Sequence, residues 1–353
     1  MVQDQYRVLN EDHCVYIKTS KDGFVILSLY VDDILLTGNH KAFIESTKRW
    51  LSINFDMKDM GEASYVLGVK ITRDRSKRLL ALSQETYVRK VLERFNMTNC
   101  KGIDTPVEKN INLSKEMSPK NSDEKEKMKN IPYSNAVGSL MYAMMCTRPD
   151  ICYGVGLVSR FQTDPGFEHW KAVKRILRYL KSTTDYSLVY QGKDLKLIGY
   201  SDADWAGDPD ERKSTSGYAY ILNGGAISWS SKKQSCIALS TMEAEYIAIC
   251  STVQEAVWLR RFLKHLSVTQ DASDPVHIWT DSTAALAYAK DPKYHGRTKH
   301  IEMKYHYVRS MIEKKRVALQ HISTSLMVAD PLTKPLSKEL FLAHVKTLGL
   351  RRV

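Results

Sequence analysis

Two groups of acidic residues have the types and spacing to do chemistry. The first is the pair Asp32 and Asp33, which falls between the apolar runs 25–31 and 34–38. Two adjacent carboxylates at such a turn can hold a divalent metal ion. Asp is also common in ordinary hairpin turns, so these two residues alone leave both interpretations open.

The second group consists of acids spread over the C-terminal part of the sequence. Alternation along a strand-like run places Ile198, Tyr200 and Asp202 on one face, and an acid that ends an apolar strand costs free energy unless it binds something. Asp281 repeats this arrangement after a second strand-like run. Taken singly, each aspartate has a structural alternative as a turn or helix-capping residue.

Two glutamates and a late aspartate complete the second group. Ser240 and Glu243 fit a capping box at the start of a predicted helix, which gives Glu243 a structural task. Glu245 is then left to project from the first turns of that helix, and we select it as the functional glutamate. Asp330 stands directly before Pro331, where helix capping is the simplest interpretation of this residue alone.

The elements that carry the first group are predicted from apolar spacing. We expect consecutive antiparallel strands, a short helix, a further hairpin, and a helix that begins at Ser83 with that residue as its N-cap. The ranges are 15–18, 24–30 and 34–37 for the strands, 41–51 for the short helix, and 65–71 with 79–82 for the hairpin.

The elements that carry the second group follow a polar stretch. Residues 100–132 are charged and show no apolar period, so we interpret them as a mobile linker. From residue 195 to about 239 the sequence is rich in strand patterns. The expected helices are 133–146, 150–161, 167–181, 241–266, 283–289, 302–314 and one at the end, and the expected later strands are 276–280 and 317–322.

The charge balance favours a polyanionic partner. There are 52 Lys and Arg against 40 Asp and Glu, a net charge of +12, and nucleic acid leads the list of such partners. The six cysteines form no Cys-x-x-Cys pair, so neither a zinc site nor a disulfide framework is indicated and a reducing compartment is expected. Arg148 and Asp150 interrupt the longest apolar stretch, so we expect a soluble chain without a membrane segment.

Several strings resemble copia-type retrotransposon Pol polyproteins. Residues 30–38, Tyr-Val-Asp-Asp-Ile-Leu-Leu-Thr-Gly, are similar to the second catalytic motif of their reverse transcriptases. Further similar strings, in order, are 56–68, 82–87, 132–142, 147–151, 210–218, 240–246 and 328–335. The resemblance covers essentially the full chain.

The resemblance implies an α+β or α/β fold in four parts. These are a partial reverse-transcriptase palm and the start of the thumb at 1–99, the polar linker at 100–132, a helical thumb or connection region at 133–194, and a ribonuclease H-like domain at 195–345. The last part should contain a mixed five-stranded sheet with flanking helices.

The resemblance also implies a ribonuclease H. The residues that match the Asp-Glu-Asp-Asp set of that fold are Asp202, Glu245, Asp281 and Asp330. They would hold two magnesium ions, with manganese as an alternative, and the substrate would be the RNA strand of an RNA–DNA hybrid. No DNA polymerase activity is expected from this chain alone, because the family needs a third aspartate on an earlier palm strand. Asp32 and Asp33 would then be a vestigial polymerase metal site.

Basic residues are candidates for contact with nucleic acid. They are Lys171, Lys174, Arg175, Arg178, Arg212 and Lys213. The first four form one face of the predicted helix 167–181, and a merely solvated surface would look the same.

Histidines are assigned by position. His321 is the one candidate for the histidine that related nucleases carry shortly before the last aspartate to assist product release. His295, His300 and His306 match no zinc spacing, so structural or solvent-facing roles are favoured.

Two other interpretations remain open. The chain could be a non-catalytic nucleic-acid-binding relic of a degenerate element, or a fragment of a longer reverse transcriptase. Its partners would be an RNA–DNA hybrid or other nucleic acid, a second copy of itself, or the rest of a Pol polyprotein. The expected location is intracellular, either cytoplasmic in a virus-like particle or nuclear.

Overall fold

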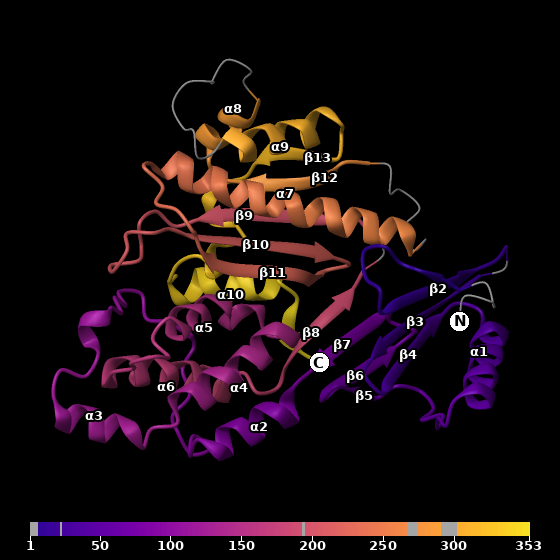
Figure 1. Cartoon of the computed structure of the whole chain (residues 1–353), viewed down its shortest axis with the longest axis horizontal. Helices are drawn as coiled ribbons and strands as arrows, with labels where there is room; N and C mark the ends of the chain where they lie inside the picture. The colour runs from indigo at the N-terminus through magenta and orange to yellow at the C-terminus, as the bar shows by residue number, and fades with distance from the viewer. Residues whose placement is uncertain (1–5, 22, 193–194, 267–273, 291–301) are drawn as a thin grey trace. The chain divides into compact units, whose positions relative to one another are not determined.

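The chain is seen in a computed structural model that describes residues 6–21, 23–192, 195–266, 274–290 and 302–353 (Figure 1). Its contacts divide it into two compact units. Unit 1 comprises Met1–Ser64 and Glu255–Asp274, and unit 2 comprises Tyr65–Gln254 and Pro275–Val353. Among the helices in the described ranges, none is long and apolar enough to cross a membrane.

Unit 1 contains a four-stranded antiparallel sheet with the order β1-β2-β3-β4. Its elements are β1 (Arg7–Val8), β2 (Val15–Thr19), β3 (Phe24–Tyr30), β4 (Asp33–Gly38) and α1 (Lys41–Asn54). Alternation along β2 and β3 buries Val15, Ile17, Val25 and Leu27. The predicted strands and the short helix are therefore confirmed, with ends that differ by at most three residues.

A first sheet of unit 2 combines distant parts of the chain. It has the order β14-β8-β7-β6-β5, and all its pairs are antiparallel. Its strands are β5 (Tyr65–Val66), β6 (Val69–Asp74), β7 (Leu79–Ser83), β8 (Tyr186–Gln191) and β14 (Leu350–Arg352). The predicted hairpin of 65–71 with 79–82 corresponds to β6 with β7, but its first strand is interrupted, because β5 ends at Val66 and β6 begins at Val69. The sequence did not predict β8 and β14, since β14 is too short to show a periodic pattern.

Helices pack beside this sheet around the largest cluster of buried apolar residues. They are α2 (Glu85–Arg94), α4 (Tyr133–Cys146), α5 (Cys152–Ser159), α6 (Phe167–Ser182) and α10 (Lys338–Thr347), whereas α3 (Ser122–Lys129) contributes no residue to this cluster. The N-cap prediction at Ser83 was wrong: Ser83 ends β7, and the N-cap of α2 is Gln84. The helix thus starts one residue later than expected. The Ser83 Oγ still accepts a hydrogen bond from the Glu85 N–H at 3.2 Å.

The polar segment 100–132 is packed within unit 2, which differs from the mobile linker we expected. Val107, Leu113 and Met128 are buried, and the segment contains α3 and the 3₁₀ turn η2 (Lys115–Met117). Single apolar residues, spaced far apart in the sequence, hold this segment in place. Their wide spacing explains why no helical or strand period marked the segment in the sequence.

A charged network lies in the core of unit 2. Arg148 and Asp150 are 2% and 1% exposed, and the guanidinium donates to the carboxylate at 3.0 Å through Nε and at 2.7 Å through Nη2. Arg148 also donates to the carbonyl and hydroxyl oxygens of Thr183, and the Tyr179 hydroxyl donates to Asp150 at 2.6 Å. Every charged group is thus hydrogen-bonded, as burial of charge requires.

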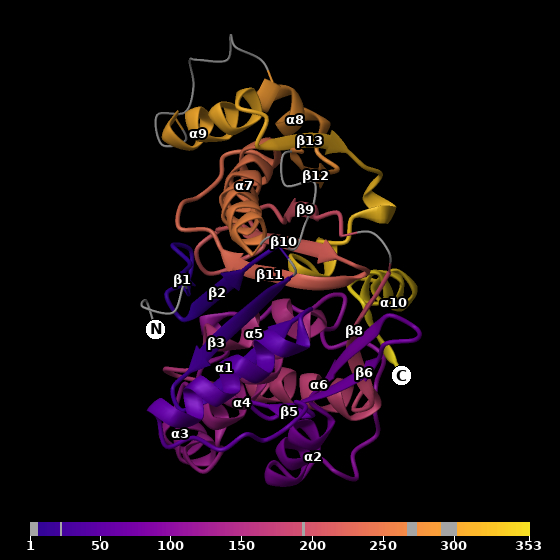
Figure 2. The same ribbon diagram turned by 90° about the vertical axis from the view of Figure 1, so that its right-hand side faces the viewer.

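The second sheet of unit 2 has the order β11-β10-β9-β12-β13 (Figure 2). Strands β9, β10 and β11 pair antiparallel, whereas β12 runs parallel to both β9 and β13. The elements are β9 (Ile198–Ala203), β10 (Thr215–Leu222), β11 (Gly225–Lys233), α7 (Thr241–His265), β12 (Val276–Thr280), α8 (Thr283–Lys290), α9 (Glu302–Glu313) and β13 (Val317–His321). The predicted mixed five-stranded sheet with flanking helices is confirmed.

Helices of unit 2 are fixed to this sheet by specific contacts. The Thr252 hydroxyl of α7 donates to the Ser201 hydroxyl of β9 at 2.9 Å, and the Tyr220 hydroxyl of β10 donates to the Thr252 carbonyl oxygen at 2.5 Å. Helices α8 and α9 contact β13. The N-terminal part of α7 is therefore held at a fixed place beside the strand that carries Asp202.

Candidate metal centre

The four predicted acids come from four different elements of unit 2. Asp202 lies near the end of β9, and Asp281 directly follows β12. Because β9 and β12 are parallel neighbours, their carboxyl ends meet at one edge of the sheet. Glu245 projects from the first turns of α7, and Asp330 begins the 3₁₀ helix η5 (Asp330–Leu332).

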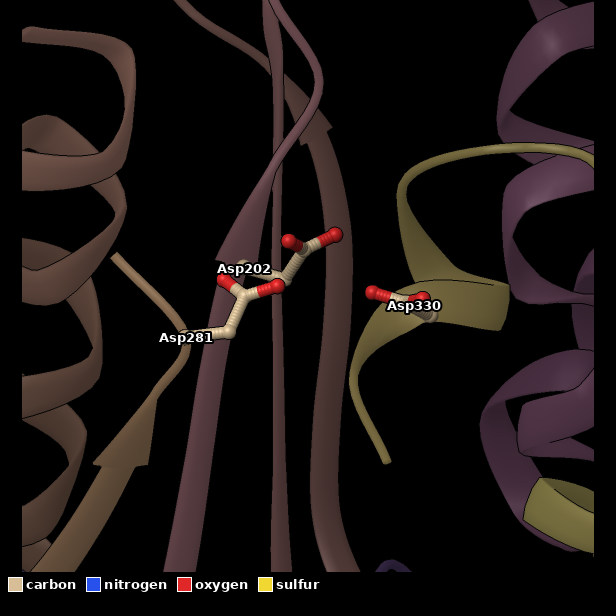
Figure 3. A group of neighbouring side chains, drawn as sticks. All are labelled: Asp202, Asp281 and Asp330. Atoms are coloured by element: carbon tan, nitrogen blue, oxygen red, sulfur yellow. The ribbon is translucent and has the colours of Figure 1, made fainter. Parts of the chain in front are cut away.

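Three of these acids converge. One carboxylate oxygen from each of Asp202, Asp281 and Asp330 lies within 4.8 Å of the others. Figure 3 shows the carboxylate of Asp330 pointing from its turn towards those of the other two. Asp202 and Asp330 are each 1% exposed, so their charges are largely removed from water.

Glu245 lies beside the three converging aspartates but outside the group whose oxygens are within 4.8 Å. Burial, followed by the charges of Asp202 and Asp281, raises the pKa of Glu245 to about 9, while the Ala203 N–H acts in the opposite direction. Its Oε2 is buried without a hydrogen-bond partner. Glu245, which we selected from the sequence, therefore lies beside the three aspartates. It is not one of the acids whose oxygens lie within 4.8 Å of one another.

The sequence predicts a helix-capping role for Glu243, and its contacts agree with that role. The Glu243 N–H donates to the Ser240 Oγ at 3.2 Å, as in a capping box. The Glu243 carboxylate accepts from the Leu239 N–H at 2.7 Å, one residue earlier than the box would place it. Glu243 is thus committed to the start of α7.

Replacement of either glutamate should separate these roles. We expect Glu243→Ala to lower the free energy of unfolding by about 1 kcal/mol, because a cap is lost, with binding of divalent metal retained. Glu245→Gln should retain stability and weaken that binding. Urea unfolding and a metal titration of both variants measure this, and equal loss of metal binding in the two would contradict the assignment.

Residues next to the acids complete their surroundings. The Lys334 Nζ lies 2.9 Å from Asp330 Oδ1 and 3.3 Å from Asp202 Oδ2, and the Thr333 hydroxyl donates to Asp202. Gly217 pairs with Asp202 across the sheet, and a Cβ there would lie 2.6 Å from the Thr333 side chain. The missing side chain of Gly217 therefore lets the 330–334 turn reach the end of β9.

The donor set suits a hard divalent cation. All the converging groups are carboxylates, which is the ligand type that Mg²⁺ and Mn²⁺ share. The buried Oε2 of Glu245 is costly without a partner, and a nearby cation would offset that cost. The residues present therefore fit a divalent metal centre, with no distinction between these two ions.

Asp32 and Asp33 occupy a different setting in unit 1. They lie at the β3–β4 turn, and both side chains are exposed. The preceding Val31 adopts a φ of 50° and is 88% exposed. Within the ranges that the structure describes, no third acid joins them to form a metal-binding group.

Comparison with known proteins gives the family. A family described as "Reverse transcriptase (RNA-dependent DNA polymerase)" matches residues 1–109. The retrovirus-related Pol polyprotein from transposon TNT 1-94 of Nicotiana tabacum is 50% identical over 351 residues, 99% of this chain. The putative transposon Ty5-1 protein of Saccharomyces cerevisiae is 34% identical over 69% of this chain and 78% of its own length. The chain belongs to the copia-type retrotransposon Pol polyproteins.

The chain spans 26% of the length of the tobacco Pol polyprotein. Among solved structures, LC11-RNase H1, isolated from compost, is 19% identical, and the similarity covers 40% of this chain and 94% of that chain with a TM-score of 0.31. A similarity at that score does not decide the fold, which rests on the strand order of unit 2 given above.

The Pol family string 328–335 contains two residues beside the acids that we did not select from the sequence. Only Asp330 was chosen there, although Thr333 and Lys334 both contact Asp202. The spacing of Asp330 and Lys334, four residues apart, was the available signal, since such pairs face each other across one helical turn.

The basic residues proposed to contact nucleic acid differ in which other groups of this Pol chain their side chains contact. Arg178 Nε donates to the Lys101 carbonyl oxygen at 2.8 Å, and Arg175 donates to the Thr105 hydroxyl at 3.2 Å. These two residues therefore bind the 100–108 segment, whereas Lys171 and Lys174 lie over the Phe167 ring near the surface.

The two remaining basic candidates lie between β9 and β10. Arg212 is exposed in a turn with a φ of 54°, and Lys213 pairs with Glu211 at 2.7 Å. Arg212 thus has the more accessible charge of the two, and the role of both in nucleic-acid contact stays a prediction.

The structure describes two of the four histidines considered in the sequence, His306 and His321. His321 ends β13, is exposed, and pairs in register with Thr280, the residue before Asp281. It therefore shares a sheet edge with the carboxylates, and its role in product release stays a prediction. His306 is exposed on α9, while His295 and His300 lie outside the described residues.

Stability should depend on pH and on metal together. Burial, and then the charge of Asp202, raises the pKa of Asp330 to about 7, and Glu245 is raised to about 9. At these two carboxyl groups the folded protein holds more protons than the unfolded chain from about pH 4 to about pH 9, so their contribution to the stability of the metal-free protein should fall as pH rises through this window.

A divalent cation favours the ionised carboxylates and should reverse this trend. We expect excess Mg²⁺ to raise the melting temperature more at about pH 8 than at about pH 5.5. Thermal unfolding with Mg²⁺ or EDTA at both pH values measures it. The same Mg²⁺-induced shift at both pH values would contradict the proposed coupling.

Proposed function

We propose that this chain is a magnesium-dependent nuclease that hydrolyses the RNA strand of an RNA–DNA hybrid. The observation that carries the proposal is the convergence of Asp202, Asp281 and Asp330 within 4.8 Å, with Glu245 beside them. Paired divalent ions bound by such carboxylates supply activation of a water molecule and stabilisation of the leaving oxygen of a phosphodiester.

The residues of the chain have distinct tasks in this proposal. The four acids hold the ions, and Thr333 fixes the rotamer of Asp202 through its hydroxyl hydrogen bond. The rigid end of β9 and the cap of α7 keep two of these acids in place before substrate arrives, which is the preorganisation that catalysis needs. Preference for RNA would come from contact with the 2′-hydroxyl.

A cleavage assay tests the proposal. The substrate is an RNA–DNA hybrid labelled on the RNA strand, with single-stranded RNA and double-stranded DNA as comparisons. We expect cleavage of the hybrid with Mg²⁺ or Mn²⁺ and none with EDTA. Salt-dependent binding of the hybrid without cleavage would instead favour a non-catalytic nucleic-acid-binding protein.

Replacement of Asp32 separates the two acidic sites. Asp32→Asn should leave cleavage of the hybrid within about twofold of the parent, because Asp32 belongs to unit 1 and the nuclease acids to unit 2. The purified chain should extend no primer, since only two carboxylates meet at this turn in the described residues. Primer extension that Asp32→Asn abolishes would contradict this view.

A further inference from the structure

Lys334 occupies an unusual position for a lysine. Its ammonium group lies 2.9 Å from Asp330 Oδ1 and 3.3 Å and 3.4 Å from the two oxygens of Asp202. Both aspartates are 1% exposed, whereas the Lys334 side chain is 33% exposed. The lysine thus reaches from the surface into the carboxylate group.

The charges around Lys334 explain why it is held there. Within the described ranges, it is the one basic side chain with a nitrogen within 4.0 Å of either Asp202 or Asp330. Like charges that crowd together in a buried site repel, and a cation between them offsets that repulsion. One ammonium group therefore balances two acids that are both placed to bind a divalent ion.

We propose that Lys334 is a resident counter-ion of the metal centre, an inference that rests on the proposed nuclease function. Lys334 holds Asp202 and Asp330 together while no divalent ion is bound, and it gives up both contacts when the ion enters. Binding of the ion is then an exchange of cations, so Lys334 lowers the apparent affinity for metal and stabilises the metal-free protein.

The position and exposure of Lys334 allow this exchange of cations. Lys334 follows Asp330 by four residues, just after η5. The released ammonium group therefore stays near the centre. The Lys334 side chain is 33% exposed, which allows the head group to turn towards water without repacking of the core. Asp202 does not depend on Lys334 alone, because the Thr333 hydroxyl also holds it.

Metal titration of lysine variants tests the inference. Mn²⁺ binding is measured by calorimetry, without substrate, for the parent chain, Lys334→Met, Lys334→Gln and Lys334→Arg. We expect the Met and Gln variants to bind Mn²⁺ about tenfold more tightly, or about 1.4 kcal/mol, and the Arg variant to stay near the parent. Their metal-free melting temperatures should fall, and saturating Mn²⁺ should restore them.

Lys338→Met is the matched control. Lys338 lies one turn later and pairs with the exposed Asp104 at 2.8 Å, so its loss removes the same charge without touching the centre. Its Mn²⁺ affinity should equal that of the parent chain. An equal gain in affinity in this variant would assign the effect to net charge and overturn the inference.

Two negative outcomes are distinguishable. If the parent chain binds no Mn²⁺, or if Asp202→Asn binds it as well as the parent, the metal centre itself is wrong and the proposed function fails. If the parent binds Mn²⁺ through Asp202 but Lys334→Met and Lys334→Gln bind it equally or more weakly, only the counter-ion role is overturned. Weaker binding would make Lys334 a positioning residue for the ligands.

Discussion

Asp202→Asn is expected to reduce cleavage of the RNA strand by at least about 10³-fold, or about 4 kcal/mol of transition-state stabilisation. Asp202 takes part in several interactions of the centre: it is grouped with Asp281 and Asp330, accepts from Thr333, and pairs with Lys334. Asparagine keeps the shape and one acceptor oxygen but removes the charge that binds metal.

The same variant should fold normally without metal. Removal of one of several crowded negative charges relieves repulsion, so the melting temperature of metal-free Asp202→Asn should equal or exceed that of the parent chain. Single-turnover cleavage and thermal unfolding together measure the two effects. Cleavage close to the parental rate would show that the carboxylate group is not the active site.

Asp204→Asn is the control for this experiment. Asp204 lies two residues beyond Asp202 and is outside the group of converging oxygens. Burial raises its pKa to about 6, and its carboxylate accepts from the Thr215 N–H, a bond that an asparagine oxygen can also accept. Cleavage should therefore change by less than about threefold, a small effect on the free-energy scale.

Asp150→Ala should be the most destabilising of the substitutions proposed for this chain. The substitution leaves the buried Arg148 guanidinium without its carboxylate and the Tyr179 hydroxyl without its acceptor. Loss of one partner of a buried ion pair costs about 3–5 kcal/mol. Urea unfolding should show this loss as a lower midpoint at similar slope.

An exposed ion pair provides the comparison. Glu85 and Arg89 are in contact at 2.6 Å one turn apart on α2, and both side chains are at least 40% exposed. Glu85→Ala should therefore cost less than about 1 kcal/mol. If both substitutions cost the same, the hydrogen bonds of the buried network do not contribute as the geometry indicates.

The sequence predicted those parts of the fold whose patterns are local. Strand β12 was predicted with its observed ends, and α7 to within one residue, because alternation and helical spacing extend over their whole length. The pairing of β8 with β7 and β14 could not be predicted, since it joins residues more than 100 positions apart and depends on packing. No short-range pattern carries that information.

The same division holds for the candidate centre. Asp202 and Asp281 were selected because each is an acid at the end of an apolar run, which is visible in the sequence, whereas Asp330 was selected through the family resemblance. Lys334 and Gly217 were not selected, because a lysine near a proline or a glycine in a strand has many ordinary explanations. Their roles follow only from proximity to Asp202 in the folded chain.

The pairing of β14 with β8 has a practical consequence for anyone who produces the nuclease part separately. A recombinant fragment with the boundaries 195 and 345 would lack β7, β8 and β14, so residues of α10 and β11 that pack near them would be uncovered. Keeping β14 without its partner strands would instead leave an open edge that can recruit other molecules. The full chain should stay monodisperse at concentrations where the 195–345 fragment precipitates.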